Sequence, residues 1–343
     1  MILISTGLNR GQNTRVKGSR AVYGEIGSEF HSMPLEQGKG VILPRKGTLV
    51  FSGRSAIEAV LKHLPDVKTA LLPSYCCDSI IEPFRRAEIE ISFYDVNDHY
   101  GLEIQIDQTS DILLFCNYFG FKTEIPEYEG IIIEDITHSF FSDCQYHVQS
   151  DYLVASLRKW APIYCGGYCS IHVSGCLPPE EFIEGKKKSM KMKTQYLEDY
   201  DKKKKEKFFL GFGTSNMWLG QNYSGLLIDT YSKKYLSCVD MERQKYIRRR
   251  NAHMLYEGLQ GKYQFLFSEE NMDCPLFVPI LIEEKERDRV RRKLIDHQIY
   301  CPVHWPHPNA ECESNLYDRE LSLICDQRYD EGDMERIISV LCD

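Results

Sequence analysis

The sequence predicts an α/β protein in which a mainly parallel sheet, covered on both faces, is followed by a smaller α+β unit. Continuous apolar runs such as ILLF and IIIED alternate with segments of helical pattern. Strands that are apolar along their whole length are typical of parallel sheets, because helices cover both faces of such sheets. Polar residues follow the ends of several of these runs, which is where functional groups gather in open α/β sheets.

Strands and helices alternate from Lys46 onward. A short strand over Lys46–Phe51 leads through Ser52 into an amphipathic helix whose apolar residues recur every three or four positions. The same patterns predict, in order, the strand Lys68–Pro73, the helix Cys76–Arg86, the strands Ile89–Val96, Asp111–Tyr118, Gly130–Asp135 and Asp151–Ser156, and a further strand from Gly166.

The composition changes beyond Leu177. Residues 180–207 are rich in lysine interleaved with acidic residues, which we interpret as a solvated helix face rather than a basic binding patch. Tyr223–Leu259 has a long helical pattern, and a smaller α+β unit follows. We therefore divide the chain into an N-terminal arm (1–45), a large domain (46–235) and a small C-terminal domain (236–343). The smaller unit is predicted from the strand Pro275–Ile282, the helix Lys285–His297, the strand Glu320–Cys325 and the helix Met334–Leu341.

Bulk properties exclude some classes of protein. The 343 residues carry a formal net charge of −8, which argues against a dedicated nucleic-acid binder, because phosphate contacts need a basic field. No apolar stretch is long enough to span a bilayer, and the N-terminus has no apolar core of a secretory signal. Thirteen cysteines form no CxxC pair, so we expect reduced thiols and a cytoplasmic location.

The functional prediction depends most on the segment Ser150–Ser170. It reads as a strand, a tight turn carrying Lys159, and a second strand. An ammonium group between two buried strands must be solvated, paired or deprotonated, and a deprotonated lysine is a nucleophile suited to Schiff-base chemistry. A lone lysine after a strand is usually only a solvated strand end. Asp135, at the end of the preceding apolar strand, favours the catalytic interpretation.

A second feature is the helix start Ser52-Gly53-Arg54-Ser55. Small residues at a helix N-terminus leave N–H groups free to bind phosphate, although Ser52 or Ser55 could instead be a simple N-cap. Other polar residues fall at the carboxyl ends of the predicted strands, and the sheet should therefore bring them together: Ser74, Tyr75, Asn117, Asp135 and the segment 156–159.

Taken in order, these motifs resemble those of the fold-type I pyridoxal-phosphate (PLP) enzymes, most closely the DegT/DnrJ/StrS group of aminotransferases. The resemblance implies a large domain with a mainly parallel, seven-stranded type of sheet, PLP as the cofactor, and a homodimer with shared active sites. It covers residues 47–259 in motif order and rests on SGRSAI (52–57), LLPSYCC (71–77), CNYFG (116–120), IIEDITHS (132–139), SLRKW (156–160), GGY (166–168) and LGQNYSGLLID (219–229).

The resemblance also implies roles for single residues. Lys159 would hold the cofactor as a Schiff base and move the proton during the reaction, and Asp135 would pair with the pyridinium nitrogen. His138 would meet the ring's hydroxyl side, and Asn222 would reach the phosphate of the neighbouring subunit. The complete cofactor set is Gly53, Arg54, Ser55, Tyr75, Asn117, Asp135, His138, Ser156, Lys159 and Asn222.

The chain departs from the pattern of this group at several positions. Ser156 lies three residues before the lysine rather than five, and Arg158 stands between them where a histidine is usual. By strict spacing the ring-stacking aromatic residue falls on Cys77, which leaves Tyr75 as a substitute. Asn117 replaces a common histidine. These departures leave the substrate and the type of reaction open.

Two residues of the small domain are candidates for substrate binding. Arg328 could bind a substrate carboxylate, because a guanidinium fork matches two carboxylate oxygens, or it could form an ion pair with Asp326 or Asp330. His304 lies in a Pro-rich loop that could reach the site. We expect no metal site, since His304 and His307 have no third ligand at fixed spacing.

The resemblance therefore implies a PLP-dependent aminotransferase that moves an amino group from an amino-acid donor to a keto acceptor. The acceptor in this group is often a nucleotide-linked keto-sugar, and another biosynthetic keto intermediate is the alternative. A different PLP reaction on an amino acid (elimination, decarboxylation or side-chain replacement) also fits the motifs. So does a catalytically silent PLP-fold binding protein, although Lys159 and Asp135 are both present.

Overall fold

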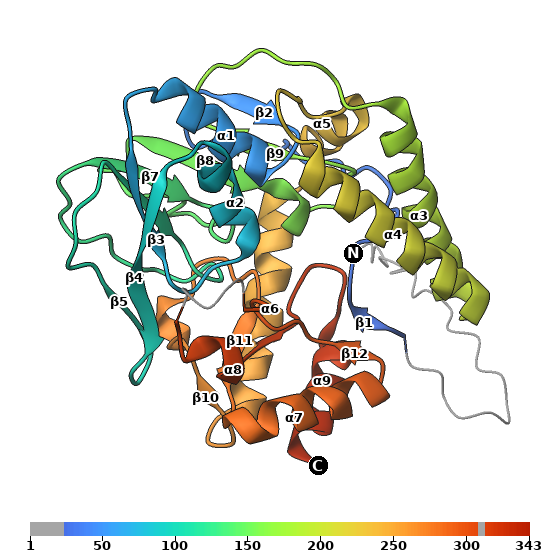
Figure 1. The fold of residues 1–343 in the computed structure, drawn as a ribbon. Coiled ribbons are helices and arrows are strands. Elements are labelled where there is room, and N and C mark those ends of the chain that lie inside the picture. The colour runs from blue at the N-terminus through green and yellow to red at the C-terminus, as the bar shows by residue number, and fades with distance from the viewer. Residues whose placement is uncertain (1–23, 308–312) are drawn as a thin grey trace, which may run out of the picture.

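A computed structural model of the protein describes residues 24–307 and 313–343 (Figure 1). The first 23 residues of the arm predicted over 1–45 lie outside the described part of the chain. The large sheet is built from β2 (Thr48–Val50), β3 (Thr69–Pro73), β4 (Glu90–Asp98), β5 (Leu102–Gln105), β6 (Ile112–Cys116), β7 (Ile131–Asp135), β8 (Tyr152–Ser156) and β9 (Gly167–Cys169). Its strand order is β2-β9-β8-β7-β6-β3-β4-β5.

The centre of this sheet is parallel. Neighbouring strands from β8 to β4 run in one direction, whereas β9, β2 and β5 pair antiparallel at the two edges. The predicted α/β class with a mainly parallel sheet is therefore confirmed. The described sheet has eight strands rather than the expected seven, because the antiparallel edge strand β5, which the sequence patterns did not predict, pairs with β4. In the register of the central strands, Cys116 lies opposite Asp135, and Asp135 lies opposite Val154. The carboxyl ends of β6, β7 and β8 therefore meet at one edge.

Helices α1 (Gly53–His63) and α2 (Asp78–Arg86) lie in front of this sheet in Figure 1. The apolar stripe of α1, which includes Ile57 and Val60, is buried. The long helix expected over Tyr223–Leu259 is divided into α5 (Thr230–Leu236) and α6 (Met241–Leu259). The side chain of Asp240 accepts a hydrogen bond from the Arg243 N–H and so caps a new helix there.

The lysine-rich segment forms a hairpin of two helices, α3 (Glu180–Asp199) and α4 (Lys202–Gln221). Our interpretation of this segment as a solvated face is wrong for Lys186 and Lys193, which are buried. The amine of Lys193 donates to the Ser28 hydroxyl at 2.6 Å and to the Glu29 carbonyl at 2.5 Å. Acceptors from the N-terminal arm, about 160 residues away along the chain, therefore allow these lysines to be buried.

The smaller unit is an antiparallel sheet packed with helices. It contains β10 (Gln264–Phe265), β11 (Val278–Leu281), β13 (Glu320–Leu323), α7 (Glu284–Asp296), α8 (Leu316–Arg319) and α9 (Glu331–Cys342). The arm strand β1 (Ile26–Gly27) pairs in parallel with β12 (Ile299–Tyr300) beside this sheet. Figure 1 shows α6 running from the large sheet to the small unit. The boundary between the large and the small domain, placed at residue 235 from the sequence, remains a prediction. Within the described residues, no helix has the length and apolar character needed to cross a membrane.

Candidate active site

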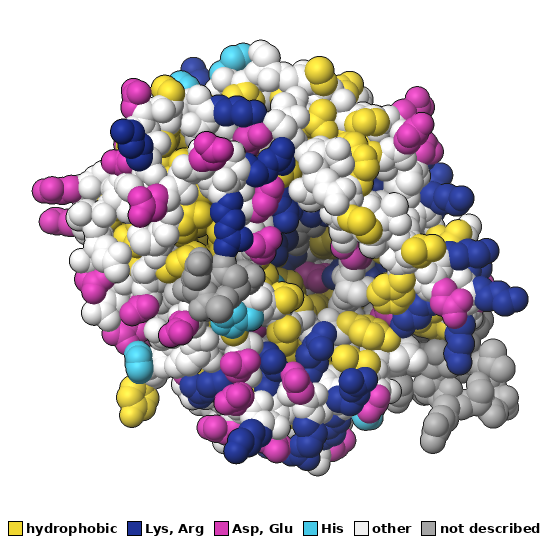
Figure 2. Space-filling model, viewed as in Figure 1, with side chains coloured by type: hydrophobic (Ala, Val, Ile, Leu, Met, Phe, Trp, Pro, Cys, Tyr) yellow, Lys and Arg dark blue, Asp and Glu magenta, His cyan; other side chains and the backbone are white. Residues whose placement is uncertain are grey.

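A cavity of about 230 Å³ lies at the carboxyl edge of the parallel strands. Figure 2 shows a hollow on this face of the molecule, with basic side chains near its rim. Most residues that line the cavity come from the ends of β6, β7 and β8 and from the starts of α1 and α2, while Leu219 comes from α4 and Trp305 from the loop after β12. The lining includes Ser52, Gly53, Arg54, Cys77, Ser79, Cys116, Asn117, Asp135, Thr137, His138, Ser156, Arg158, Lys159, Leu219 and Trp305.

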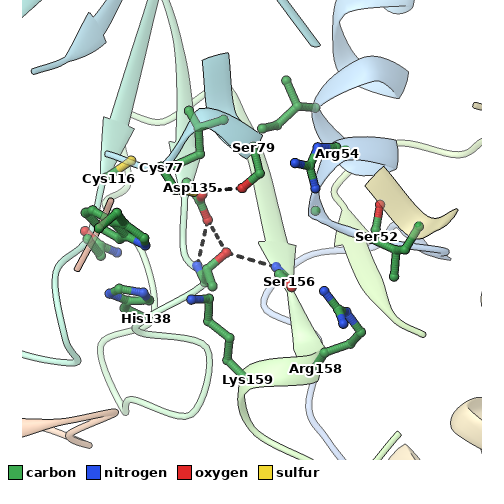
Figure 3. A pocket seen from close by; sticks show the side chains of 17 residues that line it. Ser52, Arg54, Cys77, Ser79, Cys116, Asp135, His138, Ser156, Arg158 and Lys159 are labelled. Carbon is green, nitrogen blue, oxygen red and sulfur yellow. Dashed lines mark hydrogen bonds between the residues drawn. The ribbon is translucent and has the colours of Figure 1, made fainter. Parts of the chain in front are cut away.

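Lys159 ends a single 3₁₀ turn, η1 (Leu157–Lys159), directly after β8. Two hydrogen bonds fix this turn: the Leu157 N–H donates to the Gly166 carbonyl, and the Trp160 indole N–H donates to the Thr137 carbonyl. The amine of Lys159 points into the cavity towards Asp135 and His138 (Figure 3) and makes no hydrogen bond or ion pair within the described residues. Burial lowers the pKa of Lys159, against the opposing effects of Cys77 and Asp135. The amine is therefore available as a nucleophile and as a base.

Asp135 is buried at the end of β7. Its Oδ1 accepts hydrogen bonds from the N–H of Thr137, at 2.8 Å, and from the Thr137 hydroxyl. Its Oδ2 accepts none from the described residues. Burial raises the pKa of Asp135, while the bonds from Thr137 and the charge of Lys159 act in the opposite direction. The Thr137 hydroxyl also accepts from the Ser156 N–H at 2.9 Å, which ties the ends of β7 and β8 together.

His138 and Asn117 lie at the same end of the cavity as Asp135. The Nδ1 atom of His138 accepts from the Phe119 N–H at 3.1 Å, so the neutral ring carries its proton on Nε2. Burial, Lys159 and His304 hold the pKa of His138 well below its usual range. The Asn117 amide donates to the Glu134 carboxylate at 2.9 Å. Both side chains are therefore held in single orientations.

The opposite end of the cavity has the character of an anion site. Gly53 and Arg54 open α1, with Ser52 as the N-cap. A Cβ atom on Gly53 would lie 3.2 Å from the Ser156 Cβ, so glycine allows the helix N-terminus to approach β8. The Nε atoms of Arg54 and Arg158 are buried and make no hydrogen bond within the described residues, although the Nε of Arg54 lies 3.5 Å from a carboxylate oxygen of Glu82. Figure 3 shows both arginines at this end. Guanidinium groups beside a helix N-terminus suit a phosphate dianion.

Not every predicted residue reaches this cavity. The Ser55 hydroxyl donates to the Tyr223 carbonyl at 2.9 Å, outside the cavity wall. Tyr75 is fully buried against Tyr118 and Trp305, whereas Cys77 lines the cavity at the position that strict spacing indicated. Asn222 is exposed at the C-terminus of α4, where its amide donates to the Trp218 carbonyl.

A second cavity, of about 280 Å³, shares Arg158 and Lys159 with the first and extends towards the small unit. Arg328 and His304 both line it. Arg328 forms the ion pair with Asp326 that we considered from the sequence: Nε lies 2.9 Å from Oδ1 and Nη2 lies 2.7 Å from Oδ2. Its Nη1 donates to the Ser28 and Glu29 carbonyls. The fork of Arg328 is thus occupied by the protein itself.

Several residues that line these cavities were not predicted as site residues, among them Thr137, Arg158, Glu29 and Arg248. Thr137 lies inside the IIEDITHS motif, and its spacing from Asp135 could have identified it. Arg158 lies in the strand-end segment 156–159 but was otherwise noted only as a departure from the family pattern. Trp305 belongs to the Pro-rich loop that was expected to reach the site, whereas Glu29 and Arg248 reach the cavities through contacts far away in the sequence.

The parallel sheet with its smaller unit is a fold that this chain shares with several solved aminotransferases. Among solved structures, the chain is similar to the aminotransferase TlmJ from Streptoalloteichus hindustanus (14% identity, 86% of this chain and 84% of that one, TM-score 0.59). It is also similar to the PLP form of Spr1654 from Streptococcus pneumoniae (12%, 92% and 97%, 0.60) and to DesI in the presence of its TDP-sugar product (11%, 87% and 80%, 0.57). No protein-family model and no curated protein matches the sequence.

Proposed function

We propose that this protein is a PLP-dependent aminotransferase that moves an amino group from an amino-acid donor to a keto acceptor. One observation carries the proposal: the amine of Lys159, which has no partner in the described part of the chain, lies in a cavity between a buried carboxylate, Asp135, and an anion site formed by Arg54 and Arg158. These groups match the aldehyde, the ring nitrogen and the phosphate of PLP. Structures of Spr1654 in PLP and PMP forms support this cofactor.

The similar proteins support a sugar-linked acceptor. CalS13 from Micromonospora echinospora is described as a sugar aminotransferase, and DesI was solved with its TDP-sugar product. We therefore propose a nucleotide-linked keto-sugar as the acceptor. The hollow at the carboxyl edge is open to the surface, as such a large substrate requires (Figure 2).

The residues of the cavity can perform the proton transfers of this reaction. Bound PLP would accept the negative charge that develops on the substrate carbon bonded to the amino group. Lys159 would hold the cofactor and exchange a proton with that carbon, which its lowered pKa favours. Asp135 would help to keep the ring nitrogen protonated, and His138, whose Nε2 carries the proton, would help to orient the ring. Trp305 and Leu219 line the wall of the cavity.

The first prediction tests the role of Lys159. After reconstitution with PLP the protein should be yellow, with an absorbance band in the visible range. Borohydride should fix the cofactor to the peptide that contains residues 156–160. Lys159→Ala should abolish this labelling, while Lys193→Met, which removes another buried lysine, should leave it unchanged. A label on a different lysine would refute the proposal. Formation of a keto acid from a panel of amino donors would separate transamination from other PLP chemistry.

A further inference from the structure

The wall of the first cavity lacks an aromatic residue at the position where the family pattern places one. Cys77 occupies that position, and its thiol shares a hydrogen bond of 2.7 Å with the Ser79 hydroxyl. Tyr75, the substitute that the sequence suggested, is fully buried and does not line the cavity. A thiol has no π face, so an aromatic contact to a flat ring in this cavity has to come from another segment.

Trp305 provides such a ring. It lies in the loop after β12 of the small unit and lines the first cavity, and its side chain is only partly buried. His138 is the other aromatic ring that the described part of the chain contributes to this wall. The centres of the two rings are 5.9 Å apart, and their planes differ by 25°. These two side chains therefore form the aromatic part of the wall.

Contacts from both units hold the Trp305 ring in place. Its centre lies 4.9 Å from the centre of the Tyr75 ring, which belongs to the large domain. The residue before it, His304, is tied to β13: its N–H donates to the Glu320 carboxylate at 2.7 Å, and its Nδ1 lies 2.8 Å from the Ser322 hydroxyl. A ring that is already ordered loses little conformational freedom when a ligand packs on it, which favours binding.

We infer that Trp305 packs against the pyridine ring of the bound cofactor and replaces the aromatic contact that Cys77 cannot supply. The inference rests on the proposed function, in which Asp135 pairs with the ring nitrogen and Arg54 and Arg158 bind the phosphate. The ring then spans the cavity between these two ends, and Trp305 lines that same cavity. Because Trp305 belongs to the small unit, the cofactor would contact both units of the chain.

The test measures equilibrium binding of pyridoxamine 5′-phosphate (PMP), which has no aldehyde and so binds without a Schiff base. Trp305→Leu should weaken PMP binding by at least about fivefold, as expected for losing an aromatic contact and its buried area. Trp305→Phe, which keeps an aromatic ring, should lose much less. Binding of inorganic phosphate, which occupies only the anion site, should be equal in all three proteins. Trp218→Leu is the matched control, because Trp218 packs against Phe51 and Phe182 instead of lining the cavity.

A second measurement uses the unaltered chain and does not depend on how a variant folds. In hydroxyl-radical footprinting read by mass spectrometry, saturating PMP should protect Trp305 from oxidation and leave Trp218 unchanged, while inorganic phosphate should protect neither. Equal PMP affinity in wild type and a folded Trp305→Leu, or equal oxidation of Trp305 with and without PMP, overturns the inference and leaves the proposed function standing. A wild-type protein that binds neither PMP nor PLP overturns the proposed function and the inference with it.

Discussion

At the scale of single residues, one carboxylate oxygen of Asp135 is hydrogen-bonded to Thr137, and the other has no partner within the described chain. Thr137 supplies both hydrogen bonds to Oδ1, so the carboxylate cannot rotate away, and Oδ2 stays free of partners within the described chain. Burial raises the pKa of Asp135, yet a protonated ring nitrogen next to it would restore the anionic form. The side chain is therefore well placed to hold a cation at that point.

Asp135→Asn tests this role. The substitution keeps the shape of the side chain and removes the negative charge, so the fold should be preserved. We expect the half-reaction with an amino donor to slow by at least about a hundredfold, which is typical of losing one well-placed electrostatic group. Single-turnover absorbance measurements give the rate. Thr137→Val is the comparison: it keeps the charge and loses the hydroxyl bond, and should cost less. A rate within a few-fold of wild type in Asp135→Asn would make Asp135 a purely structural residue.

The sequence was sufficient to predict the residues that lie at strand ends. Lys159, Asp135, Asn117 and Ser156 meet in one cavity because parallel strands place their carboxyl ends at one edge, and apolar runs reveal such strands. The direction of a side chain in a turn depends on local dihedral angles, and this is why Cys77 rather than Tyr75 lines the wall. Which arginines keep guanidinium atoms without a hydrogen bond depends on contacts between distant segments, and no spacing in the sequence predicts such contacts.

At the scale of elements, the N-terminal arm forms part of the wall of the second cavity. Ser28, Glu29 and Phe30 line that cavity, and Lys193 and Arg328 hold the arm through its backbone carbonyls. Lysine-rich helices are usually solvated, so the sequence pattern of α3 gave no indication that Lys193 would be buried. Lys193 can be buried because the N-terminal arm supplies hydrogen-bond acceptors, and the sequence of the arm has only a weak secondary-structure pattern.

His31 makes the docking of this arm sensitive to pH. Burial, followed by the charges of Arg328 and Lys193, lowers the pKa of His31 to about 4 in the folded protein, although Asp326 opposes this. Below about pH 6.5, His31 would bind a proton more readily when the arm is released than when it is docked. The docked arm is therefore most stable above about pH 6.5, and its stability falls as the pH decreases towards 4. Lys193, whose pKa is lowered from 10.5 to about 8 on docking, contributes only above this window, and Glu29, whose pKa is lowered from 4.5 to about 2, contributes only below about pH 5.

Hydrogen exchange measures this effect directly. The amides of Ile26 and Gly27, which donate to the Gln298 carbonyl and the Tyr329 hydroxyl, should lose protection between pH 6.5 and 5 after correction for intrinsic rates. In His31→Gln the loss should be much smaller, because the substituted side chain does not titrate. Equal losses of protection in both proteins would assign the effect to other groups.

At the scale of the whole molecule, α4 has exposed apolar side chains, which is unusual for a helix face in contact with water. Phe209, Leu210 and Met217 are 47%, 74% and 62% exposed, and this helix ends at the exposed Asn222. The family resemblance implies that this asparagine serves the phosphate of a neighbouring subunit. An apolar helix face that leads to such a residue is consistent with a homodimer, in which one partner would complete the anion site of Arg54 and Arg158 in the other.

The last prediction is therefore that two inactive variants restore activity when mixed. Lys159→Ala removes the reactive amine, and Asn222→Asp places a negative charge against the phosphate of the partner. A mixed dimer contains one site with both changes and one site with neither, so up to half of its sites should work. Asn222→Ala alone should loosen the cofactor about fivefold, since one neutral hydrogen bond contributes about 1 kcal/mol. Each variant remixed with itself is the control. If Asn222 served its own subunit, every mixed dimer would keep one damaged group in each site, and activity would not return; a monomer that binds PLP tightly would also contradict the shared site.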